Sequence, residues 1–227
     1  IYIFKLKWQQ ILLLTLSGIL SNALPAFLFA MAQTGIDSYV AGILNSTTAL
    51  FTLILGVAFF KFKARWFNVA GVFIALIGVF GLLSVAGGQN LTFNFHYGIY
   101  IIIATLMYAV NINIIKRYLT GIPTIPMVSL VFFLPGLVIG FYLFFYTDFL
   151  PIIQTNPDAY MGVVYVGILG IVGSAIALLI FYHMVKFVNV LFAASITYLI
   201  PIVSIFWGVI DGEAFNLLYL LWIMLII

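Results

Sequence analysis

Amide, hydroxyl and phenol side chains interrupt the long apolar stretches of this sequence, and they are the groups best suited to bind a solute there. If the stretches lie in lipid, such groups are costly and tend to face a cavity or a neighbouring helix. Together they could bind an amino-acid-like solute through hydrogen bonds and aromatic stacking. We predict that eight of them line a solute path: Asn22, Asn45, Thr48, Tyr108, Asn111, Ser174, Ser195 and Tyr198.

The spacing of these residues favours shared helix faces. A separation of three positions recurs in the pairs Asn45 and Thr48, Tyr108 and Asn111, and Ser195 and Tyr198. Residues three apart lie on the same side of an α-helix. The alternative interpretation is that Ser and Thr bond their own helix and Asn joins neighbouring helices, for roughly 0.6–2 kcal/mol each. Both interpretations stay open for each residue taken singly.

Prolines inside apolar stretches could bend the helices that carry the solute path. Proline removes a backbone N–H and kinks a helix, which leaves carbonyl groups free. We predict Pro25 and Pro201 as hinge or gate positions, with ordinary structural kinks as the alternative.

The residue types needed for catalysis or metal binding are scarce. The sequence has no Cys, two His and five scattered Asp and Glu residues. No acidic residue lies deep in an apolar stretch, and His183 stands near the end of one, where an interfacial role is expected. We therefore predict no catalytic residue, no metal site, no cofactor and no enzyme activity.

The composition requires lipid as the solvent. Of the 227 residues, 66% are hydrophobic and 6% are charged, whereas a soluble domain carries roughly 25% charged residues. A bilayer core needs about 20 apolar residues in a helix. Seven complete stretches of this kind are present: 11–31, 39–60, 66–85, 97–115, 126–146, 159–182 and 188–210. An eighth starts near Phe215 and runs to Ile227. The sequence predicts an all-α, polytopic membrane helix bundle.

The charged residues fix an orientation. Successive segments between spans must lie on alternate sides of the membrane. Under this assignment all eight basic residues fall on one side: Lys5, Lys7, Lys61, Lys63, Arg65, Lys116, Arg117 and Lys186. All five acidic residues fall on the other: Asp37, Asp148, Asp158, Asp211 and Glu213. Because basic loops are retained in the cytoplasm, we predict a multi-pass protein of the inner, cytoplasmic membrane with its basic loops cytoplasmic. The partners expected are a small-molecule substrate and the lipid bilayer, with a homodimer also considered and no nucleic acid.

Two parts of the sequence resemble each other but carry opposite loop charges. Without a gap, residues 11–78 align with residues 160–227, which places Ser46 on Ser195 and Thr48 on Thr197. The basic loop 61–65 then aligns with the acidic loop 210–214. Copies that cross the bilayer in opposite directions are typical of secondary transporters, whose substrate path lies between the repeats. The alternative is two ordinary three-helix stretches that are alike in composition.

The order of these motifs resembles the EamA-type permeases of the drug/metabolite transporter (DMT) superfamily. A span ending in a polar turn (24–34), a Ser- and Thr-rich span (42–52) and a Gly-rich span (71–78) occur in the first copy. The second copy has 195–201, which ends in Pro201, and then Asp211-Gly212-Glu213 where the family usually has Gly-Glu-Arg. The first-copy counterpart of the proline is Thr52.

The resemblance implies ten spans in two five-span repeats. About eight of the ten would be present, with residues 1–85 as the last three helices of the first repeat. Residues 86–227 would form the second repeat with its last helix truncated, so the chain would be incomplete at both ends. It also implies export or exchange of amino acids, nucleobases or similar metabolites by alternating access, often linked to protons.

Two other classes of function are weighed against a secondary transporter. An integral membrane enzyme that acts on lipid normally carries clustered His, Asp or Glu near one interface, and no such cluster is evident in the sequence. A bundle that does not transport would not need an inverted repeat or polar residues that face one another. The sequence therefore favours a permease or exporter.

Overall fold

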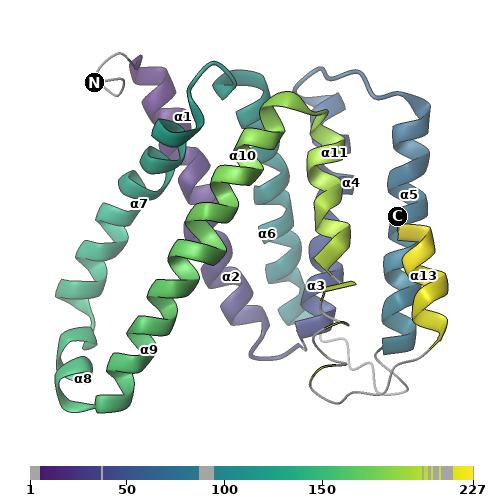
Figure 1. Ribbon diagram of the computed structural model, residues 1–227. Helices are drawn as coiled ribbons and strands as arrows, with labels where there is room; N and C mark the ends of the chain where they lie inside the picture. The colour runs from purple at the N-terminus through teal and green to yellow at the C-terminus, as the bar shows by residue number, and fades with distance from the viewer. Residues whose placement is uncertain are drawn as a thin grey trace.

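The computed structural model describes residues 6–36, 38–86, 95–200, 202–203, 206, 210 and 217–226. Within these residues every regular element is a helix, and the helices stand side by side in one bundle (Figure 1). Continuous helices long and apolar enough to cross a membrane are Trp8–Ala32, His96–Leu119, Thr124–Tyr146 and Asp158–Phe187. Shorter apolar helices are Leu44–Ala58, Trp66–Gly81 and Val190–Leu199. The predicted all-α membrane helix bundle is confirmed.

The first three spans contain two local irregularities. The first span consists of α1 (Trp8–Gly18), a π-helical segment η2 (Ile19–Ala23) and α2 (Leu24–Ala32). The second is broken at Thr47, between α3 (Ser38–Ser46) and α4 (Thr48–Ala58), whereas the third, α5 (Trp66–Ala86), is continuous. The predicted second span, 39–60, thus contains a local turn at Thr47.

The middle of the chain forms two long antiparallel passes. After α6 (Phe95–Ile114) and the π-helical η3 (Ile115–Leu119), the chain turns into α7 (Thr124–Tyr146). The short helix α8 (Phe149–Thr155) lies between the predicted spans 126–146 and 159–182. The return pass is α9 (Pro157–Ile168), the π-helical η4 (Leu169–Ile176) and α10 (Ala177–Phe187), which extends five residues beyond the predicted end at Tyr182.

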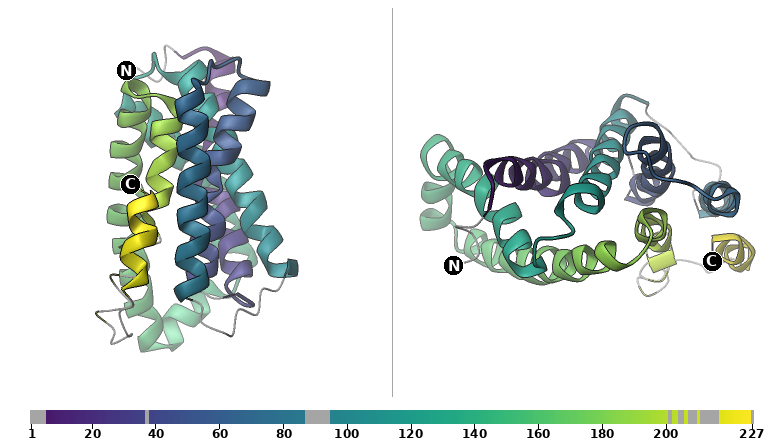
Figure 2. Two further views of the ribbon diagram at one scale, coloured as in Figure 1. Left: turned by 90° about the vertical axis from the view of Figure 1, so that its right-hand side faces the viewer. Right: turned by 90° about the horizontal axis from the view of Figure 1, so that it is seen from above.

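The last described elements are α11 (Val190–Ser195), the 3-10 turn η5 (Ile196–Leu199) and α13 (Leu218–Ile226). Viewed from above, the pair formed by α5 and α13 lies at one end of the bundle and α7 lies at the other (Figure 2). Between them, α6 packs against both α2 and α4. This central position of α6 lets its side chains reach several other helices.

Glycines allow two of the closest helix contacts. A Cβ on Gly18 of α1 would overlap the main-chain oxygen of Val131 in α7, and a Cβ on Gly81 of α5 would overlap the ring of Trp222 in α13. Small residues at such contacts let membrane helices approach closely and gain van der Waals packing. These contacts fix α7 against α1 and α13 against α5.

Candidate functional site

Three buried polar side chains from distant parts of the chain meet in the interior of the bundle. Ser17 of α1, Asn111 of α6 and Tyr182 of α10 are 0%, 2% and 0% exposed. The Ser17 hydroxyl donates to Asn111 Oδ1, and Asn111 Nδ2 donates to the Tyr182 hydroxyl at 3.1 Å. Ser17 Oγ also lies 3.4 Å from the Tyr182 oxygen. One hydrogen-bonded group therefore joins three spans.

The π-helical segment η2 adds two more residues to this group. Tyr182 donates its hydroxyl proton to Ser21 Oγ at 3.1 Å, and Asn22 Nδ2 donates to the same oxygen at 2.7 Å. We call Ser17, Ser21, Asn22, Asn111 and Tyr182 the polar junction. A π-helical turn inside an α-helix often marks a functional site, and here it lies directly beside Ser21 and Asn22. The junction therefore includes two of the predicted path residues, Asn22 and Asn111.

A second polar group surrounds the break between α3 and α4. Thr47 Oγ1 binds the carbonyl of Leu44 at 2.6 Å and lies 3.4 Å from Thr105 Oγ1 on α6. Thr48 Oγ1 binds the carbonyl of Asn45 at 2.7 Å. The side-chain oxygen of Asn45 is buried and has no hydrogen-bond partner among the described residues. Two more predicted residues, Asn45 and Thr48, thus lie in this second group and not in the polar junction.

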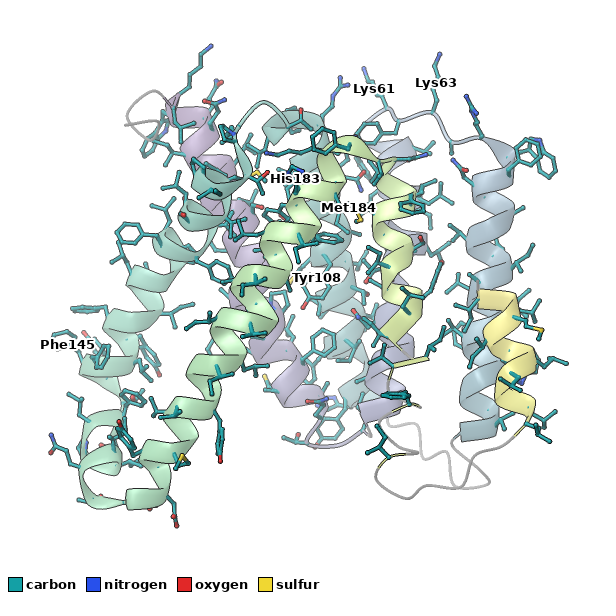
Figure 3. All side chains as sticks on the ribbon, viewed as in Figure 1. Lys61, Lys63, Tyr108, Phe145, His183 and Met184 are labelled. Carbon is teal, nitrogen blue, oxygen red and sulfur yellow. The ribbon has the colours of Figure 1, made fainter. Side chains whose placement is uncertain are left out.

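The other predicted path residues are dispersed. Tyr198 is 3% exposed and donates to the carbonyl of Val72 on α5 at 3.3 Å. Tyr108 stands at mid-height on α6, with its ring centroid 6.2 Å from that of Phe29 (Figure 3). Ser195 binds the carbonyl of Phe192 in its own helix at 2.9 Å, and Ser174 is half-buried in η4. The structure does not bring these four together.

Of the two predicted hinge positions, the structure describes Pro25. Pro25 is buried in the first turn of α2, immediately after η2. Its missing N–H could not donate to the preceding turn, and the π-helical segment lies at that place in the chain. Pro201 lies outside the described residues.

Two lysines at the ends of α10 and η3 were not predicted as functional. Lys116 Nζ donates to the carbonyls of Val185, Lys186 and Val188 at 3.0, 2.9 and 2.8 Å. Lys186 Nζ in turn donates to the carbonyl of Ile122 and, at 3.0 Å, to Thr124 Oγ1. A Lys near a helix C-terminus can satisfy its last carbonyls. The pair ties the ends of α10 and η3 together.

Irregular segments occur at equivalent places in the two aligned parts of the sequence. The shift of 149 positions places η2 (Ile19–Ala23) on the region of η4 (Leu169–Ile176), and it places Thr47 on Ile196, the first residue of η5. The span from α1 to α2 and the span from α9 to α10 run in opposite directions (Figure 1). The aligned segments therefore share local backbone irregularities as well as composition.

Three members of the polar junction were not predicted, because the sequence near each of them does not indicate its hydrogen-bond partners. Ser17, Ser21 and Tyr182 depend on partners that are 71 to 165 positions away in the chain. Among the described residues, no group of three or more His, Cys, Asp or Glu side chains could hold a metal ion. The chemistry available in the polar junction is therefore uncharged hydrogen bonding.

Comparisons with known proteins agree with this architecture. An uncharacterized transporter of Synechocystis sp. is 29% identical over 126 residues, which are 52% of this chain and 36% of that protein. This chain thus spans about a third of that relative. A solved crystal structure, at 20% identity, superposes with a TM-score of 0.69 over 92% of this chain and 70% of that chain, which shows a shared fold. The pattern of the EamA-like transporter family matches residues 1–84 and 97–227, and the chain belongs to this family of multi-pass membrane transporters.

Proposed function

We propose that this chain belongs to a secondary transporter, a permease or exporter that moves small organic metabolites such as amino acids across the cytoplasmic membrane by alternating access. Family membership and the transporter relative point to a membrane transporter. The substrate class and the mechanism are our inference from the polar groups in the interior.

The polar junction is the observation on which this proposal depends. It offers an amide from Asn111, hydroxyls from Ser17 and Ser21 and a phenol from Tyr182, all within one connected group. Uncharged donors and acceptors of this kind can exchange their mutual hydrogen bonds for bonds to an amino or carboxylate group of a solute. Because the group is buried, a solute that displaces these bonds must replace them or leave polar atoms unpaired.

Alternating access would follow from two halves that move against each other around the polar junction. Ser17 and Ser21 come from the first aligned segment and Tyr182 comes from the second. Asn111 of α6 contacts both. Inverted repeats place substrate sites at their interface near the middle of the bilayer. A separation of the α1–η2 side from α10 would break the Ser21–Tyr182 bond and expose the polar groups to a solute.

The proposed orientation places the basic end of the bundle in the cytoplasm. Lys61 and Lys63 lie at the same end of the bundle as His183, near the end of α10 (Figure 3). Basic residues near the ends of spans determine which side stays cytoplasmic. A homodimer stays a prediction that rests on the sequence alone.

A membrane enzyme is the second class of function considered, and the site favours it less. Acid–base or metal chemistry needs titratable groups that can reach one reacting atom. The polar junction contains serines, asparagines and one tyrosine, and no carboxylate or imidazole among its described members. These groups suit reversible binding of a solute better than bond cleavage.

Counterflow in proteoliposomes tests the transporter proposal. Proteoliposomes that contain the full-length protein would be loaded with one unlabelled amino acid at a time. Uptake of the labelled form of that amino acid into the vesicles would then be followed. We expect at least one small metabolite to give counterflow. Tyr182→Phe and Asn111→Ala should each lower its rate by about tenfold, which corresponds to about 1.4 kcal/mol.

A control variant distinguishes loss of the junction from general damage. Ser129→Ala removes an exposed hydroxyl that binds the carbonyl of Ile125 in its own helix, at 2.9 Å. Its counterflow should equal that of the unmodified protein. An absence of flux for every solute tested with correctly folded protein would favour the enzyme or the bundle that does not transport.

A further inference from the structure

A groove opens at the basic end of the bundle, where α10 ends and α7 begins. It has a volume of about 540 Å³, and its polar wall includes Thr120, Thr124, His183 and Lys186. Its apolar wall includes Ile125 and Phe187, which are 71% and 75% exposed. None of the described residues that line it is acidic. The groove is separate from the polar junction, because it shares none of that group's residues.

The polar wall has donors for an anion. Lys186 Nζ uses two of its three N–H bonds, on the carbonyl of Ile122 and on Thr124 Oγ1. The third is available to a ligand in the groove. Thr124 Oγ1 lies 3.5 Å from His183 Nδ1, so a hydroxyl and an imidazole also border the same space. A phosphate oxygen could accept from all three groups.

The first turn of α7 adds backbone donors at the same place. Helix N-termini leave their first N–H groups without intrahelical acceptors and carry a partial positive charge. In α7, which has 23 residues, these include the N–H groups of Thr124 and Ile125, both of which line the groove. The helix end and Lys186 therefore favour negative charge at one point.

The depth of the groove in the membrane identifies the anion. Thr124 is the first residue of one apolar helix long enough to cross a bilayer, and Phe187 is the last residue of another. The groove consequently lies at the boundary between hydrocarbon and headgroups. Basic pockets at this level between membrane helices bind the headgroups of anionic lipids.

We propose that this groove binds one anionic phospholipid, with its phosphate between Lys186, His183 and the start of α7 and with its acyl chains along Ile125 and Phe187. The charge of the groove selects an anionic headgroup over a zwitterionic one. The exposed apolar residues beside it select a lipid over a free anion. The bound lipid bridges α7 and α10, and it should stabilise the contact between them.

The test compares lipids on the purified full-length protein in detergent. Phosphatidylglycerol should raise the midpoint of thermal unfolding, whereas phosphatidylcholine and inorganic phosphate at the same concentration should not. Native mass spectrometry should show one retained phosphatidylglycerol. His183→Glu places a negative charge in the groove and removes no buried group, since His183 is exposed. It should weaken binding about fivefold, or about 1 kcal/mol for one unit of charge at an anionic surface.

Gln9→Glu is the matched control, because it adds the same charge at an exposed position on α1 outside the groove. It should retain the effect of phosphatidylglycerol. Equal stabilisation by phosphatidylcholine or by inorganic phosphate would overturn the proposal. So would equal losses of lipid binding in His183→Glu and Gln9→Glu. None of these readouts involves transport, so the outcome is independent of the proposed function.

Discussion

The ammonium group of Lys116 donates a hydrogen bond to the main-chain carbonyl of Lys186, 2.9 Å away, and Lys186 in turn binds the segment that follows η3. Lys116 stands five residues after Asn111, and Lys186 stands four residues after Tyr182. At about 1.5 Å per residue, the lysine pair lies roughly 6–8 Å from the Asn111–Tyr182 bond along the same two helices. The α6–η3 span and α10 are thus joined both at the Asn111–Tyr182 bond and at the lysine pair.

Replacement of Lys116 by Met should destabilise the folded protein. Met keeps an unbranched apolar chain but removes the donor for three carbonyls at the end of α10. We expect the free energy of unfolding to fall by about 1–2 kcal/mol. This value lies between the contribution of a charge at a helix end and that of a hydrogen bond to a charged group. The midpoint of thermal unfolding in detergent measures the loss. Lys63→Met, at an exposed loop position, should leave it unchanged, and equal midpoints for both variants would show that the cap contributes nothing.

The helices themselves could be predicted because length and apolarity suffice to define a membrane span. The stretch 126–146 was expected and α7 is Thr124–Tyr146. The stretch 66–85 was expected and α5 is Trp66–Ala86. Lipid imposes the same requirement on every span, since each backbone group must bond within its own helix. Such a requirement can be recognised from composition without knowledge of the neighbouring helices.

The site could be predicted only in part because its members depend on distant partners. Asn111 can be recognised from the sequence as an amide in an apolar stretch. Nothing near Ser17 in the sequence indicates that its hydroxyl reaches α6. Tyr182 was placed at the end of a span, where tyrosines often meet the headgroups. The helix continues to Phe187, and Tyr182 is completely buried. The break at Thr47 could not be predicted from a proline or glycine, because neither residue stands at that position.

An alanine at Gly18 should weaken the contact between α1 and α7, whereas an alanine at Gly136 should not. The added Cβ at Gly18 would overlap the main-chain oxygen of Val131, and at Gly136 it would meet no atom of the described residues within 4 Å. Overpacking of this kind costs about 1–3 kcal/mol, while Ala in an open helix position gains up to about 1 kcal/mol over Gly. Unfolding in detergent should therefore shift in opposite directions for the two variants. A midpoint for Gly18→Ala at or above that of the unmodified protein would contradict the close approach.

Asn45→Ala should impair transport without loss of folded protein. The side-chain oxygen of Asn45 is buried without a partner among the described residues, and an unpaired buried acceptor costs about 1–3 kcal/mol. If Asn45 served only the structure, its removal would lower the unfolding midpoint and leave transport intact. We expect the reverse, namely an unchanged or higher unfolding midpoint and a lower counterflow rate. Ser84→Ala, which removes an exposed hydroxyl bound to the carbonyl of Gly81 at 2.7 Å, serves as the control. Counterflow at the unmodified rate in Asn45→Ala would remove this residue from the solute path.

Opposite insertion of the two aligned segments is the prediction that bears most directly on the proposed mechanism. The loop that contains Lys63 and the aligned loop that contains Glu213 carry opposite charge, so the rule that basic loops stay inside places them on opposite sides of the bilayer. This chain has no Cys, and Lys63→Cys and Glu213→Cys would each introduce a single thiol into it. In intact cells a maleimide that cannot cross the membrane should label the second variant and leave the first unlabelled until the cells are opened. Labelling of both from the outside, or of neither, would place the loops on one side. Two segments inserted in the same direction could not form an inverted repeat, and the alternating-access proposal would then lack its structural basis.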